Sequence, residues 1–220
     1  DVFITESTFG LPIYRWMPQA QLFAEIGDWW RANAEEGRAS VLLCYAFGKA
    51  QRILHGLGGV HAGIGPIVVH GALEPLNAAY RAAGVALPPT VRVTDPGADA
   101  ALLRRALVLA PPSARGTPWL RRFGANHSDA FASGWMQLRA PRRPRAVDRG
   151  FVLSDHADWP GLQAAVAGTG AERVIVTHGS VAVLVRWLNE LGLQAQGFRT
   201  EFGEQDDEPP APQPGEAELS

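Results

Sequence analysis

Short apolar runs alternate with longer amphipathic stretches along most of this chain. The apolar runs occupy residues 2–4, 40–44, 67–69, 106–109, 151–153 and 174–176, and we expect them to form β-strands. Amphipathic spacing predicts helices over residues 19–36, 48–57, 74–83, 160–166 and 181–191. Strands that alternate with helices indicate an α/β fold.

Composition changes at two places along the sequence. Residues 141–145 are rich in arginine and proline and predict an exposed connection. Residues 203–220 are acidic, rich in proline and nearly free of apolar side chains, so we expect a disordered tail there.

The bulk numbers limit the class of protein. With 220 residues and 46% hydrophobic content, the chain can bury a core in one or two domains. No apolar run reaches about 18 residues and the start lacks a secretory signal, so we expect a soluble, cytoplasmic protein without membrane contact. The single cysteine, Cys44, excludes an internal disulfide and a cysteine-based zinc site. The net charge of −2 still allows a local basic track for nucleic acid at residues 121–122 and 139–145.

Polar side chains cluster where three of the expected strands end, at residues 5–8, 154–158 and 177–179. The carboxyl ends of parallel strands collect ligands and catalytic groups in α/β folds. Two carboxylates and a histidine within five residues are also costly to bury without partners or a metal. The candidate site residues are therefore Glu6, His156 and His178.

Each cluster also has a purely structural interpretation. Asp158 would cap the following helix, His178 would be a hydrogen-bonded histidine at a strand end, and Glu6 would be a solvated loop residue. The joint occurrence at three strand ends favours a site. We interpret the other histidines as structural or surface residues: His55, His61, His70 and His127. The glycines of residues 56–59 match no phosphate-binding loop.

Four segments together resemble the β-CASP branch of the metallo-β-lactamase superfamily: residues 4–10, 41–51, 154–158 and 176–179. Within that branch the chain looks most like bacterial DNA-ligase-associated exonucleases, and it is also similar to mRNA 3′-end cleavage nucleases. The resemblance implies the C-terminal part of a metallo-β-lactamase αββα sandwich with an inserted β-CASP α/β cap. Residues 1–10 and 149–202 would form the core, and residues 11–148 the cap.

The resemblance also assigns roles to the candidate residues. Glu6 matches motif A, His156 motif B and His178 motif C, which implies that His178 binds zinc. It implies that His156, oriented by Glu6, protonates the leaving oxygen of a phosphodiester. Two zinc ions would act in the complete enzyme, with Mn²⁺ as an alternative. Lys49, Arg122 and residues 142–145 become candidate nucleic-acid contacts.

The family's HxHxDH ligands are not found in this sequence, which opens inside an expected strand. We therefore expect an absent amino-terminal part and an inactive fragment. The implied function is zinc-dependent hydrolysis of nucleic-acid phosphodiesters by a DNA exonuclease in ligase-associated repair. Its partners would be DNA rather than RNA, a DNA ligase and a helicase.

Three alternatives stay open at this point. The first is an RNA-processing endo- or exonuclease, which a histidine at motif C favours. The second is a catalytically inactive structural paralogue, and the third is a metallohydrolase of small esters. The sequence does not indicate the polarity of digestion or the oligomeric state.

Overall fold

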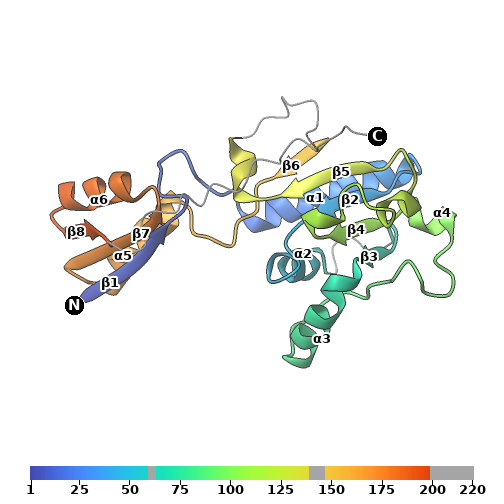
Figure 1. Ribbon diagram of the computed structural model, residues 1–220, viewed down its shortest axis with the longest axis horizontal. Helices are drawn as coiled ribbons and strands as arrows, with labels where there is room; N and C mark the ends of the chain where they lie inside the picture. Colours follow the sequence, from blue (N-terminus) through green and yellow to red (C-terminus); the bar gives the residue numbers. More distant parts are fainter. Residues whose placement is uncertain (59–62, 139–146, 199–220) are drawn as a thin grey trace, which may run out of the picture. The chain divides into compact units, whose positions relative to one another are not determined.

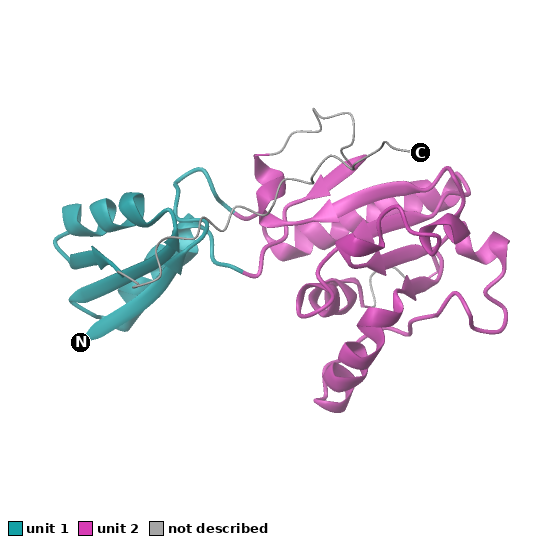
Figure 2. Ribbon diagram, viewed as in Figure 1, with its two compact units in different colours: residues 1–15, 156–220 teal, residues 16–155 magenta. Residues whose placement is uncertain are grey.

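The computed structural model describes residues 1–58, 63–138 and 147–198, and the chain divides into two compact units (Figure 2). Unit 1 combines Asp1–Arg15 with His156–Ser220, and unit 2 is Trp16–Asp155. The expected disordered tail, residues 203–220, lies outside the described residues. The two segments of unit 1 are far apart in sequence, so unit 2 is an insertion between them.

Unit 2 is built on a five-stranded sheet in which every pairing is parallel. Its order is β3-β4-β2-β5-β6 (Figure 1). The strands are β2 (Ser40–Leu43), β3 (Ile67–Val69), β4 (Leu107–Ala110), β5 (Ser128–Ala132) and β6 (Arg149–Phe151). The central strand β2 therefore lies between segments that come much later in the chain.

Both faces of this sheet are buried. Leu107 and Leu109 of β4 pack into one hydrophobic cluster, with side chains from helices α1 and α2. Val108 and Ala110, which alternate with them, pack into a second cluster on the other face. Burial on both faces explains why the central strands read as continuous apolar runs.

Three helices of unit 2 follow the expected amphipathic stretches closely: α1 (Gln19–Glu35), α2 (Lys49–Leu57) and α3 (Glu74–Ala82). The short helix α4 (Ala100–Leu103) was not expected. Four short 3₁₀ helices are η1 (Gly71–Leu73), η2 (Pro112–Ala114), η3 (Leu120–Phe123) and η4 (Gly134–Gln137). No described helix combines the length and the apolar character that crossing a bilayer requires.

Unit 1 holds a smaller parallel sheet in the order β1-β7-β8. Its elements are β1 (Val2–Ser7), α5 (Trp159–Thr169), β7 (Arg173–Gly179), α6 (Val181–Glu190) and β8 (Gln194–Gly197). Val174 and Val176 of β7 pack with α5 and α6 in a third cluster. On the other face Val2 and Ile4 are more than half exposed.

The structure confirms the α/β class and differs from the expected strands at β5, β6 and β8. The strand expected at residues 151–153 is wrong in its bounds: β6 ends at Phe151, and the amide of Leu153 donates to the Phe151 carbonyl, which turns the chain out of the sheet. Strands β5 and β8 were not expected, because β5 begins with polar residues and β8 alternates glutamine with small residues. The assignment of the two units to a metallo-β-lactamase core and a β-CASP cap, with boundaries after residues 10 and 148, stays a prediction.

Candidate functional site

Two of the three expected polar clusters end neighbouring strands. Strands β1 and β7 are paired in parallel, with Ile4 opposite Ile175 and Glu6 opposite Thr177. The register then shifts, so that Ser7 lies opposite Gly179. This irregularity leaves one residue of β7, His178, without a counterpart on β1.

His178 adopts a conformation that is rare for a residue with a side chain. Its φ is 57°, in the left-handed region. The Ser7 hydroxyl donates to the His178 carbonyl, which ties the bulge to the end of β1. The Thr177 hydroxyl lies 2.8 Å from the His178 Nδ1, so this ring nitrogen is engaged by the neighbouring side chain.

The next residue, Gly179, cannot carry a side chain. It has a φ of 77°, and a Cβ there would lie 2.4 Å from the Ser7 carbonyl oxygen. The close approach of the two backbones therefore fixes both the bulge and the place of His178.

Glu6 and His156 form a pair within unit 1. The Glu6 Oε1 lies 3.5 Å from the His156 Nδ1, and the side chains are 32% and 52% exposed. The backbone amide of Thr8 donates to the other oxygen of Glu6 at 2.6 Å, which fixes the carboxylate. The ring of Phe9 meets the imidazole edge to face, with centroids 6.0 Å apart. A carboxylate in this position orients the imidazole.

The structural interpretation holds for Asp158. Its carboxylate accepts from the Gly161 amide at 2.9 Å and caps the start of α5. The chain from His156 into α5 is thus anchored directly behind the histidine. His55 and His70 likewise engage backbone groups, at Ala86 and Ala72.

Sequence reasoning missed a charged network in unit 2 around Asp155. The Lys49 ammonium lies 3.3 Å from the Asp155 carboxylate, and its side chain is 6% exposed. Arg52, one turn further along α2, lies 3.6 Å from the same carboxylate and donates to the Ser154 carbonyl at 2.6 Å. The spacing of Lys49 and Arg52 on one helix face was the available signal. Lys49 is therefore a buried ion-pair partner.

The interior beside this network is strongly desolvated. Burial raises the pKa of the Cys44 thiol to about 12, against the opposing effect of the nearby Lys49 ammonium. Cys44 is completely buried on the face of β2 that meets α1 and α2. The thiol is thus a packing residue.

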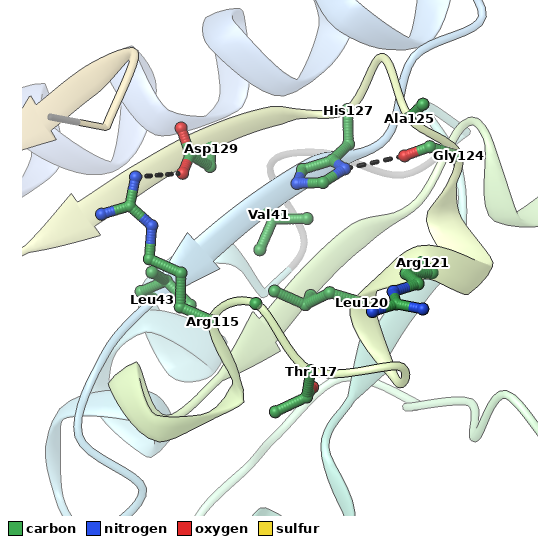
Figure 3. A pocket seen from close by; sticks show the side chains of 11 residues that line it. Val41, Leu43, Arg115, Thr117, Leu120, Arg121, Gly124, Ala125, His127 and Asp129 are labelled. Atoms are coloured by element: carbon green, nitrogen blue, oxygen red, sulfur yellow. Dashed lines mark hydrogen bonds and ion pairs between the residues drawn. The ribbon is translucent and has the colours of Figure 1, made fainter. Parts of the chain in front are cut away.

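A pocket of about 520 Å³ lies on the other face of β2 in unit 2 (Figure 3). Val41 and Leu43 form part of its wall. Arg115 pairs with Asp129 at 3.1 Å, and the His127 Nδ1 donates to the Gly124 carbonyl at 2.8 Å. The pocket shares no residue with the Glu6–His156 pair.

The expected nucleic-acid contacts have unequal outcomes. Arg122 is exposed on η3, while residues 142–145 and His61 lie outside the described residues. No group of three or more histidine, cysteine, aspartate or glutamate side chains suited to a metal occurs within residues 1–58, 63–138 and 147–198. The described residues therefore do not make a zinc site by themselves.

No family model matches this chain. The chain is 30% identical over 195 residues, 89% of its length, to a protein named "Probable DNA ligase" from Opitutus terrae (strain DSM 11246 / JCM 15787 / PB90-1). The matched region is 18% of that protein, so the chain spans about a fifth of the relative's length. The chain is similar to one segment of a much longer protein.

Proposed function

We propose that this chain belongs to a nuclease that hydrolyses DNA phosphodiesters, with His156 as the proton donor and Glu6 as the residue that orients it. The observation that carries the proposal is the contact between the His156 Nδ1 and the Glu6 carboxylate at the carboxyl end of β1. The resemblance to the β-CASP branch supports a nuclease, and the name of the similar protein supports DNA as the substrate.

The proposed step needs one proton from this chain. Water attacks phosphorus, the bond between phosphorus and the leaving oxygen breaks, and the His156 Nε2 gives its proton to that oxygen. The Glu6 carboxylate holds the imidazole in place through the His156 Nδ1 during this transfer. The proton lost by water goes to solvent or to a base that the described residues do not identify.

The proposal includes a zinc requirement, and the support for zinc is the family resemblance alone. His178 is proposed as one ligand through Nε2, since its Nδ1 is held by Thr177. The described residues offer no complete site, so further ligands must come from elsewhere, and no step is derived through the metal. Metal analysis tests this role: His178→Ala should lose bound zinc, and His156→Ala should keep it.

The complete natural protein that carries this sequence provides the first test. End-labelled single- and double-stranded DNA and RNA are offered to the wild type, His156→Ala, Glu6→Gln and the control His55→Ala. Loss of a general acid should slow DNA cleavage about 10²- to 10⁴-fold in His156→Ala, with a smaller loss in Glu6→Gln. RNA cleavage at the higher rate would support the RNA-processing alternative.

A substrate with a sulfur leaving atom separates proton donation from a structural role. A thiolate leaves without protonation, so the rate of His156→Ala should return close to the wild-type rate on that substrate. Equal cleavage of the ordinary substrate by the wild type and His156→Ala would refute the proposal.

A further inference from the structure

Two aromatic side chains lie exposed directly after the central strand of unit 2. Tyr45 is 55% exposed and Phe47 is 70% exposed, although the strand that precedes them is buried. The rest of the loop leads into α2, whose first residue is the buried Lys49. Two large exposed aromatic side chains that lie two residues apart in the chain point to a contact with another molecule.

The topology of the sheet places these residues at a favoured binding position. The sheet has the order β3-β4-β2-β5-β6 (Figure 1). After β2 the chain crosses to β3, on the side of β2 where β4 lies. After β5 it continues to β6, on the opposite side of the sheet. Strands β2 and β5 are neighbours, so their connections diverge at this edge. In open α/β sheets, ligands bind outside the carboxyl ends of the strands at such a switch point.

Charge at the same edge fits a polyanion. The Lys49 ammonium lies 5.2 Å from the centre of the Tyr45 ring. Among the described residues, Lys49 and Arg52 share one carboxylate, that of Asp155, so the group keeps one net positive charge. Lys49 is buried, and the partly exposed Arg52 is the cation that a ligand can reach. Aromatic rings beside cations form the usual platform for unpaired nucleobases, which stack on the rings while the backbone follows the positive charge.

We propose that Tyr45 and Phe47 form a stacking platform for the bases of single-stranded nucleic acid. The inference rests on the proposed function and narrows its substrate to strands with unpaired ends. Binding to this platform should not depend on the base sequence, because every base presents a π-face to an aromatic ring.

Binding is measured in the His156→Ala background, so that turnover does not interfere. The probe is a fluorescent thymidine oligomer of about twelve nucleotides, and the control is an abasic strand with the same phosphates. The His156→Ala protein, which is the starting protein for all binding variants, should bind the strand with bases more tightly than the abasic strand. Phe47→Leu should weaken binding of that strand about tenfold and leave binding of the abasic strand unchanged.

The choice of variants separates stacking from general hydrophobic contact. Phe47→Trp should keep the preference for bases, whereas Phe47→Leu and Tyr45→Leu should lose it, with unchanged thermal midpoints because both side chains are exposed. A matching uridine oligomer shows whether RNA is held equally well. No preference for bases in the starting protein, or an unchanged preference in Phe47→Leu, would overturn the platform.

The two proposals fail in different ways. Cleavage that needs His156 but binding that ignores Phe47 would refute the platform and leave the nuclease. Base-dependent binding through Phe47 without any cleavage would refute the nuclease and leave a single-strand binding surface.

Discussion

The two units use the same α/β architecture but bury their sheets differently. In unit 2 the neighbouring residues Leu107 and Val108 enter separate hydrophobic clusters, so both faces of the sheet are covered. In unit 1 the helices cover one face, and Val2 and Ile4 on the other face are 53% and 58% exposed. Glu6 lies two residues after Ile4 on β1, and residues two apart on a strand share a face. The candidate catalytic carboxylate therefore belongs to the open face.

A sheet buried on both faces and a sheet with one open face suit different side chains. Completely buried strands tolerate few polar groups, because each unpaired group costs free energy. A sheet with an open face can present carboxylates and imidazoles at its carboxyl edge at little cost. Unit 1 therefore carries the proposed reactive groups Glu6, His156 and His178, while unit 2 has the larger core.

The largest effect should come from a cavity in unit 2. Leu107→Ala removes a completely buried side chain and should lower the free energy of unfolding by about 2–5 kcal/mol, measured by urea denaturation. The matched change on the open face of unit 1, Ile4→Ala, should cost less than about 0.5 kcal/mol. Equal losses in the two variants would contradict the contrast between the units.

A smaller effect is expected at the bulge of unit 1. Gly179→Ala brings a Cβ within 2.4 Å of the Ser7 carbonyl oxygen, so it should destabilise the protein by about 3 kcal/mol and displace His178. Gly192→Ala is the control, because its φ is also positive, at 86°, but no atom lies within 4 Å of the added Cβ. We expect about 1 kcal/mol there, from backbone strain alone. Similar unfolding curves for the two variants would show that the bulge is not tightly packed.

The effect that is absent near neutral pH and develops only in alkali concerns the interior of unit 2. The pKa of Cys44 is about 12 in the folded chain and 9.0 without burial, so folding favours the protonated thiol. Its contribution to stability is complete below about pH 9 and is lost as the pH rises toward 12. The stability of Cys44→Ala should therefore fall less over this range than that of the wild type.

Thiol labelling provides an independent check of the same burial. At about pH 8.5, Cys44 should react with iodoacetamide only after unfolding in guanidinium. Rapid labelling of the folded protein would show that the interior around β2 is open to solvent.

Much of the local structure could be predicted because it depends on short-range patterns. The expected helices at residues 19–36 and 181–191 differ from α1 and α6 by one residue at the carboxyl end. Strand β5 escaped prediction because its Ser128 and Asp129 are polar, and both form hydrogen bonds with Asp148 in the folded chain. Its place beside β2 depends on tertiary pairing, which a local pattern does not contain.

The candidate site also depends on tertiary contacts that a local pattern does not contain. The sequence indicated Glu6, His156 and His178 from the polar clusters that follow apolar runs. It did not indicate that Asp155, next to His156, pairs with Lys49, or that His178 lies in a bulge. Those facts depend on groups that approach each other from distant parts of the chain.

The sequence by itself determined the alternation of strands and helices and the residues that can carry chemistry, because hydrophobic period and side-chain type are local properties. The tertiary structure alone decided which strand ends are neighbours. Parallel pairing of β1 with β7 requires a long crossover, and its register depends on backbone hydrogen bonds. That register brings the end of β1, with Glu6, beside the end of β7, with His178, and the fold of unit 1 brings His156 to Glu6.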